Sequence, residues 1–110
     1  MALYRVLEYL DGSDRSPFRD WFNSLDAQTA AKINIALTRL ANGNVSNVKG
    51  VGSGVLEVRA NFGPGYRIYF GRDGNELVIL LGGGTKRRQQ LDIEAALVRW
   101  ADYKRRKKKV

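Results

Sequence analysis

The residues of this sequence that are best suited to chemistry stand at alternate positions in two short stretches. Glu57 and Arg59 alternate with hydrophobic residues in VLEVR. Arg67 and Tyr69 do the same in YRIYF. Successive side chains of a β-strand point to opposite faces, so pairing of the two stretches would gather these polar side chains on one face. Guanidinium, carboxylate and phenol groups held together in this way suit an anion such as a phosphate.

The same alternation also has a purely structural explanation. Antiparallel sheets often turn a polar face toward solvent, and Glu57 could form cross-strand ion pairs with Arg59 or Arg67 on such a face. Pairs of this kind contribute only about 0.2–1 kcal/mol each. The pattern alone leaves the anion site and the solvated face both open, and in both cases Arg67 and Tyr69 are expected to face outward. Three more basic residues follow the next strand-like stretch and are expected at the rim of the same surface: Lys86, Arg87 and Arg88.

The residue types that are missing narrow the chemistry further. The chain of 110 residues contains neither histidine nor cysteine. This excludes zinc sites built on those ligands, triads with histidine, cysteine–histidine pairs and disulfide bonds. Any acid–base step must therefore use a carboxylate, a lysine, a tyrosine or an arginine.

Positive charge is concentrated at the C-terminal end. The formal net charge is +8, and the run KRRKKK at residues 104–109 holds six of those charges, which leaves +2 for the rest. We therefore divide the chain into a domain at residues 1–103 and a basic tail at residues 104–110. A run of like charge favours polyanions, either nucleic acid or a membrane surface. The alternative is a solvated helix end, where cations also suit the helix dipole.

Neither a membrane-spanning segment nor a secretory signal is predicted. No apolar run reaches the roughly 18 residues that a membrane span requires. The N-terminal stretch lacks the basic start and the apolar block of a signal peptide. A cytoplasmic protein without a membrane partner is therefore expected.

Hydrophobic periodicity predicts the elements that position these residues. The order is β-α-α-β-β-β-α, a small single α+β domain in which a helical hairpin packs on an antiparallel sheet. Ser16–Pro17 and Asp26 are expected to begin the two hairpin helices, and Asn42–Gly43 to end the second. Residues 44–54 are expected to form a loop, and GGGT a flexible connection to the last helix. The strands and helices are expected at residues 3–10, 18–25, 27–41, 55–61, 66–72, 76–81 and 86–106.

Several aromatic and aliphatic residues are assigned to the core rather than to a ligand site. Alternate positions of one strand share a face, and residues at helical spacing with other hydrophobic residues form buried stripes. The core is expected to include Tyr66, Ile68 and Phe70 of the strand, with Trp21, Phe22 and Trp100 of the helices.

Three stretches together resemble the sequence pattern of a known family: LEVR at residues 56–59, GPGYRIYF at residues 63–70 and LLGGGTKRRQQLDI at residues 80–93. They resemble the addiction-module killer branch of the RelE/HigB toxin superfamily, and the likeness covers residues 3–103. It implies a RelE-like fold and the function of a toxin in a bacterial type II toxin–antitoxin pair. Such a toxin is a ribosome-dependent mRNA endonuclease that inhibits translation and uses no metal or other cofactor. A helix-turn-helix antitoxin encoded beside it holds it inactive.

The resemblance also implies roles for the polar residues. In mRNA cleavage of this kind a 2′-hydroxyl attacks the adjacent phosphate, and Arg67 is expected to stabilise the charge of the transition state. Glu57 would accept the hydroxyl proton, a role that a lysine or a tyrosine with a pKa lowered by cationic neighbours would also serve. Tyr69 would stack on a base or donate a proton. Arg59 and Lys86 would hold neighbouring phosphates or the leaving group. Further RNA contacts are expected from Arg87, Arg88, Lys104, Arg105, Arg106 and Lys107.

The start of the last helix departs from the family pattern. The best-studied relatives carry a tyrosine or a histidine there, where this sequence has Gln89, Gln90, Leu91 and Asp92. The general acid is therefore not assigned.

Two other functions stay open. One is a non-catalytic RNA- or ribosome-binding domain in which the basic tail provides salt-dependent affinity. The other is an interaction module whose polar groove receives a helix or a strand of a partner protein.

Overall fold

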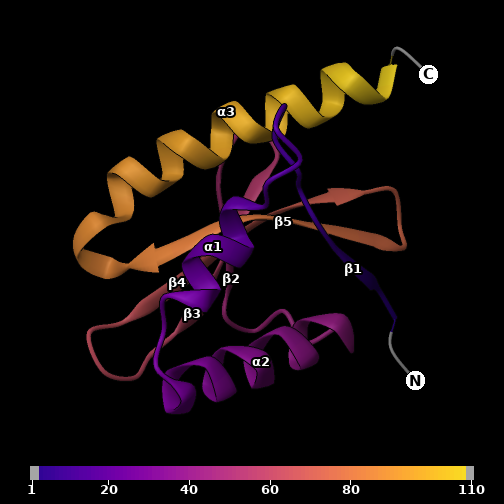
Figure 1. Ribbon diagram of the computed structural model, residues 1–110. Helices are drawn as coiled ribbons and strands as arrows, with labels where there is room; N and C mark the ends of the chain where they lie inside the picture. Colours follow the sequence, from indigo (N-terminus) through magenta and orange to yellow (C-terminus); the bar gives the residue numbers. More distant parts are fainter. Residues whose placement is uncertain (1–2, 109–110) are drawn as a thin grey trace.

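A five-stranded sheet lies between helices that cover both of its faces (Figure 1). The computed structural model describes residues 3–108. The strands are β1 (Arg5–Glu8), β2 (Val48–Gly52), β3 (Val55–Ala60), β4 (Tyr66–Asp73) and β5 (Leu77–Thr85). They are arranged in the order β1-β5-β4-β3-β2, with β1 and β5 parallel and the other neighbours antiparallel. The predicted α+β fold is confirmed, and the parallel β1–β5 pair departs from the expected antiparallel sheet.

β2 lies inside the segment expected to be a loop, so that expectation is wrong for residues 48–52. The strand forms a hairpin with β3 through Ser53 and Gly54, which have φ angles of 50° and 87°. A bulge between Gly50 and Gly52 interrupts the pairing. Glycines and a bulge in so short a strand hide the two-residue alternation by which a strand is normally predicted.

Two helices, α1 (Pro17–Asn23) and α2 (Ala27–Ala41), cover one face of the sheet. The Ser16 hydroxyl accepts a hydrogen bond from a first-turn amide of α1 at 2.9 Å, and the Asp26 carboxylate does the same in α2 at 2.7 Å. These contacts satisfy amides that have no partner within the helix, so both predicted N-caps are confirmed. Gly43 follows the end of α2 with a φ of 88°, a conformation that favours glycine.

The face under α1 and α2 is packed with apolar side chains. Ile68 and Phe70 of β4 are at most 1% exposed there, as are Phe18 of α1 and Ile33 of α2. Full burial of such a side chain contributes about 1.5–3 kcal/mol of stability. The predicted core residues on this face are confirmed. The cluster contains Phe18, Ile33, Leu40, Val58, Ile68 and Phe70, with Trp21, Phe22 and Tyr66 packed against it.

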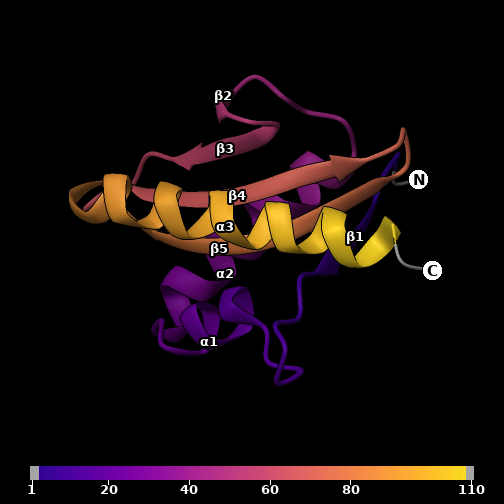
Figure 2. The same ribbon diagram turned by 90° about the horizontal axis from the view of Figure 1, so that it is seen from above.

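The opposite face is covered by α3 (Gln89–Lys108), which follows a short 3-10 turn, η1 (Lys86–Arg88). Figure 2 shows α3 running along β4 and β5. Trp100 is buried and packs on Gly71 of β4, where an added Cβ would lie 2.5 Å from the indole ring. Trp100 is therefore a core residue, as predicted. Within residues 3–108, no helix is both long enough and apolar enough to cross a membrane.

The glycines of GGGT belong to β5, so the expectation of a flexible connection is wrong. A Cβ added to Gly83 would collide with the Trp21 ring of α1, on one face of the sheet. A Cβ added to Gly84 would collide with the Asp92 carboxylate of α3, on the other face. The absence of side chains at these positions lets helices approach β5 closely from both sides.

Candidate active site

β3 and β4 place the four predicted polar residues side by side. In the strand register, Glu57 lies opposite Tyr69, and Arg59 lies opposite Arg67. Ile68, between the two residues of β4, points to the α1 and α2 side instead. The grouping predicted from strand alternation is confirmed.

This group is buried, which differs from the outward-facing surface expected from the sequence. Glu57 and Tyr69 are fully buried, and Arg67 is only 5% exposed. The same face carries apolar residues of β5 that α3 covers, and the polar residues are covered with them. The expectation that Arg67 and Tyr69 point toward solvent is therefore wrong. The side chain of Arg59, 38% exposed, does reach solvent.

The Glu57 carboxylate lies at the centre of the buried group. Its Oε2 accepts a hydrogen bond from Nε2 of Gln89, the first residue of α3, at 2.7 Å. Its Oε1 lies 3.3 Å from Nε of Arg59 and 3.8 Å from Nε of Arg67. One buried carboxylate thus lies between two guanidinium groups, and guanidinium groups can also bind an anionic ligand.

Three buried polar atoms have no hydrogen-bond partner within residues 3–108: Nε of Arg67, the hydroxyl of Tyr69 and Oδ2 of Asp92. Asp92 lies over Gly84, which pairs with Arg67 in the β4–β5 register. All three atoms therefore belong to one site. Each buried group without a partner costs about 1–3 kcal/mol of stability. We call this site the polar cluster, and it consists of Glu57, Arg59, Arg67, Tyr69, Gln89 and Asp92.

Burial raises the pKa of two members of the polar cluster. Burial, together with the negative charge of Glu57, raises the pKa of Tyr69 well above its ordinary value. Burial also raises the pKa of Asp92, although the charges of Arg88 and Arg99 act in the opposite direction. Tyr69 therefore keeps its proton at neutral pH and can donate it only to a more basic group, such as an alkoxide. The polar cluster thus combines two carboxyl groups, two guanidinium groups, an amide and a protonated phenol.

The three basic residues after β5 lie at the edge of the polar cluster. The Lys86 amide donates a hydrogen bond to the Gly65 carbonyl at 2.8 Å, which joins η1 to the turn that precedes Arg67. The side chains of Lys86, Arg87 and Arg88 are exposed. The structure therefore places them on the rim, as expected from their position in the sequence.

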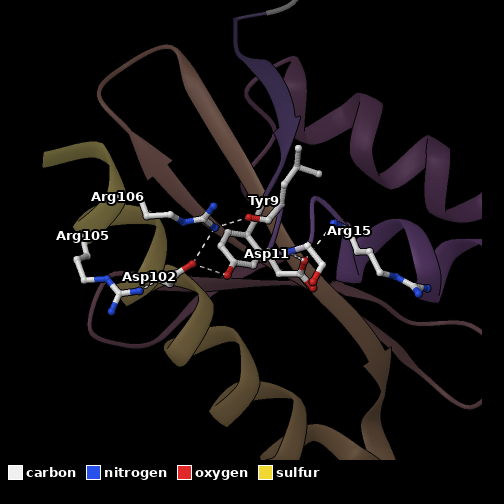
Figure 3. A network of polar contacts seen from close by, with 8 residues as sticks. Tyr9, Asp11, Arg15, Asp102, Arg105 and Arg106 are labelled. Carbon is white, nitrogen blue, oxygen red and sulfur yellow. Dashed lines mark hydrogen bonds and ion pairs between the residues drawn. The ribbon is translucent and has the colours of Figure 1, made fainter. Parts of the chain in front are cut away.

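The basic residues near the C-terminus lie at the other end of α3, about 24 Å along the helix axis from its first residue. Figure 3 shows that Asp102 pairs with both Arg105 and Arg106. Asp102 also accepts a hydrogen bond from the Tyr9 hydroxyl at 2.7 Å. These contacts fix the end of α3 to the segment that follows β1.

Two further tail residues contact the domain. Lys107 pairs with Asp73 at the end of β4, and the ammonium of Lys104 lies 5.7 Å from the centre of the Trp100 ring. The structure therefore does not bring these predicted RNA contacts to the polar cluster. Residues 109–110 of the predicted tail lie outside the described residues.

Gln89 and Asp92 are not among the site residues predicted from the sequence. Both lie in the first turn of α3, and their three-residue spacing puts them on the same side of the helix. α3 directly follows β5 in the chain, and β5 is the neighbour of β4, which carries Arg67. This adjacency is the signal from which Gln89 and Asp92 could have been placed near Arg67. Within residues 3–108, no three acidic side chains lie close enough together to bind a metal ion.

Known proteins similar to this chain point to one family. Residues 20–102, which include the whole polar cluster, match the family described as Phage derived protein Gp49-like (DUF891). A protein of Haemophilus influenzae described as "Uncharacterized protein" is 41% identical over 80 residues, which are 72% of this chain and 81% of that protein. The chain therefore belongs to the Gp49-like family.

Proposed function

We propose that this protein is the toxin of a bacterial type II toxin–antitoxin pair and that it inhibits translation by cleaving mRNA on the ribosome. The observation that carries the proposal is the Glu57 carboxylate held between the guanidinium groups of Arg59 and Arg67. The resemblance of GPGYRIYF and LLGGGTKRRQQLDI to RelE/HigB toxins supports it. The protein would act in the cytoplasm, and a helix-turn-helix antitoxin would hold it inactive.

The proposed reaction moves a phosphate from one RNA oxygen to another. The O2′ of one nucleotide bonds to the adjacent phosphorus while the bond to O5′ of the next nucleotide breaks, leaving a cyclic phosphate and a 5′-hydroxyl. Glu57 takes the proton of the 2′-hydroxyl, and Tyr69 donates its proton to the departing O5′. Arg67 stabilises the negative charge that gathers on the phosphate oxygens in the transition state.

The other basic residues would hold the RNA around the cut. Arg59, which reaches solvent, and Lys86, on the rim, would bind the neighbouring phosphates. Arg87 and Arg88 would extend this path along η1. The basic residues 104–107, at the far end of α3, would contact other RNA of the ribosome.

RNA must reach a buried site for this reaction to occur. The hydrogen bond between Gln89 and Glu57 holds the start of α3 over the polar cluster. The unpaired atoms of Arg67, Tyr69 and Asp92 favour opening, because each gains a partner when RNA or water enters. We therefore expect the first turn of α3 to shift when RNA binds.

A second candidate function is a non-catalytic RNA- or ribosome-binding domain. The complete burial of Glu57 and Tyr69 favours this alternative, because neither side chain is open to a ligand in the present arrangement. The exposed basic residues of η1 would then account for binding on their own.

Cleavage assays with purified protein test the proposal. An mRNA is incubated with the protein in the presence and in the absence of programmed ribosomes, and the ends of the products are analysed. We expect cleavage only on ribosomes, with a cyclic phosphate on one product and a 5′-hydroxyl on the other. Replacing the 2′-hydroxyl at the mapped cut by hydrogen should abolish cleavage, whereas continued cleavage would contradict the proposed chemistry. Ribosome binding without any cleavage would favour the second candidate.

A further inference from the structure

A groove lies between α2 and the end of β3, apart from the centre of the polar cluster. Its volume is about 430 Å³, within the range of small-ligand pockets. Lys32, Ile35 and Arg39 line it from one side of α2. The facing wall consists of residues 58–62 and part of the segment 44–47, which are joined by a backbone hydrogen bond from Arg59 to Asn47 at 3.0 Å.

The groove is lined by three basic residues, of which only Arg59 pairs with a carboxylate in the described part of the chain, that of Glu57. Its lining includes Lys32, Arg39 and Arg59 but no acidic residue. Within residues 3–108, Lys32 and Arg39 take part in no ion pair, whereas Arg105 and Lys107 at the end of α3 each pair with an aspartate. Unpaired cations on the wall of a groove favour a ligand that carries phosphate groups.

The rest of the lining suits the bases of a nucleic acid. Phe62 is partly exposed, with the ammonium of Lys32 at 4.8 Å and the ring of Tyr66 at 5.0 Å from its ring centre. A partly exposed ring supported in this way can stack on an unpaired base. Asn47 and Asn61 also line the groove and offer donors and acceptors to base edges. Cations, an aromatic ring and amides in one groove indicate single-stranded RNA, since the bases of a duplex are already stacked.

Arg59 connects the groove with the polar cluster. It lines the groove, and its Nε lies 3.3 Å from the Glu57 carboxylate. The pairing of β2 with β3 reaches Val58, and the Asn47 carbonyl accepts one further hydrogen bond from the Arg59 amide. Within residues 3–108, no pairing with this segment extends beyond Arg59, so the edge of β3 is uncovered from Ala60 onward. An RNA strand in the groove can therefore pass around this edge toward Arg67.

We propose that the groove binds the single-stranded RNA that adjoins the phosphate cleaved at the polar cluster. Lys32 and Arg39 would hold phosphates, and Phe62 would stack on a base. The identity of the RNA as substrate rests on the proposed function. The affinity of the groove for RNA can be measured without cleavage, so the two proposals can fail separately.

Fluorescence anisotropy with a short labelled single-stranded RNA tests the groove. The RNA carries 2′-O-methyl groups, so it cannot be cleaved through the 2′-oxygen. The double variant Lys32→Ala/Arg39→Ala is expected to bind at least about tenfold more weakly than the wild type and with a smaller salt dependence. The control Arg5→Ala/Arg15→Ala removes the same charge outside the groove and should change affinity less than about twofold. Circular dichroism establishes that each variant is folded.

A third variant separates base stacking from charge. Phe62→Leu keeps the charge and most of the apolar volume, and should weaken binding of the single-stranded RNA by about tenfold with little effect on a duplex of the same sequence. If the groove double variant and its control bind the single-stranded RNA with equal affinity, the proposal is overturned. A protein would then be the remaining candidate ligand of the groove. Loss of affinity in the groove variants, together with no cleavage by the wild type on ribosomes, would refute the proposed function but support the groove.

Discussion

The two faces of the central sheet both bury apolar side chains, but they differ in the charged and polar side chains that they bury. On the face under α1 and α2, Ile68 and Phe70 pack among other apolar residues. On the face under α3, Glu57, Arg67 and Tyr69 are buried as well, and the buried unpaired polar atoms found within residues 3–108 all belong to that side. Burial stabilises the first face but costs stability at the polar groups of the second. Both faces contribute to the core, since the face under α3 has an apolar cluster of its own that includes Ile79, Leu81 and Trp100. Only the face under α3 also buries the polar groups to which the proposed function assigns chemistry.

The largest difference in stability is expected between substitutions at two neighbouring residues whose side chains point to opposite faces of the sheet. Phe70→Ala should lower the free energy of unfolding by about 3–5 kcal/mol, because it leaves a cavity in the apolar cluster. Tyr69→Phe should leave stability unchanged or raise it, because it removes a buried hydroxyl without a partner. Urea denaturation of both variants measures the difference. A loss of stability in Tyr69→Phe as large as that in Phe70→Ala would show that the two faces do not differ in this way.

A smaller effect is expected at the two glycines of β5 that face opposite helices. Gly83→Ala should cost about 1–3 kcal/mol, because the new Cβ collides with the Trp21 ring in the packed apolar cluster. Gly84→Ala should cost less, since the Asp92 carboxylate can move away and leave its buried position. Gly12→Ala, with open space around the new Cβ, serves as the control. Chemical denaturation of the three variants would refute this comparison if Gly84→Ala were the most destabilised.

The pH dependence of stability should have opposite signs at two aspartates. The pKa of Asp92 is raised by burial, so as pH rises above the ordinary value of 3.8 the unfolded chain loses this proton first and stability falls. Asp92→Asn should therefore stabilise the protein at neutral pH and have less effect near pH 3.8.

Hydrogen bonds from Lys107 and Tyr103 lower the pKa of Asp73, so the contribution of Asp73 to stability is present above pH 3.8 and is lost as pH falls through its folded pKa. Asp73→Asn should therefore destabilise the protein at neutral pH. Unfolding curves of both variants at several pH values would contradict this account if the two differences had the same sign.

The smallest effect is expected at the exposed end of α3. Lys107→Ala removes an ion pair with Asp73 in which the lysine side chain is 57% exposed. Pairs of this kind contribute about 0–1 kcal/mol, so the unfolding midpoint should hardly move. Thermal unfolding at low and high salt checks this expectation. A large loss of stability that disappears in high salt would instead give this pair a major role in holding α3.

The sequence predicts which residues share a face better than it predicts what covers that face. Alternation in VLEVR and YRIYF correctly separated Arg67 and Tyr69 from Ile68 and Phe70. It did not show that α3 covers the polar residues, because the apolar stripe of a helix does not say against which surface it packs. The continuous apolar run of β5 already required cover on both faces, and only α3 remained to provide the second. The roles of Gln89 and Gly84 depend on that position of α3 and were therefore not predictable from local pattern.

The most direct test of the central claim is the single-turnover rate of mRNA cleavage on programmed ribosomes for variants of two neighbouring residues in β4. Arg67→Ala changes the polar cluster, and Ile68→Val removes one methyl group from the apolar cluster on the other face. If the face under α3 is the reaction site, Arg67→Ala should lower the rate by about 10²–10³ while remaining folded. The Ile68→Val variant should be about 0.5–1.5 kcal/mol less stable than the wild type, and it should cleave mRNA at a rate close to that of the wild type. A folded Arg67→Ala variant that cleaves as fast as Ile68→Val would contradict the account.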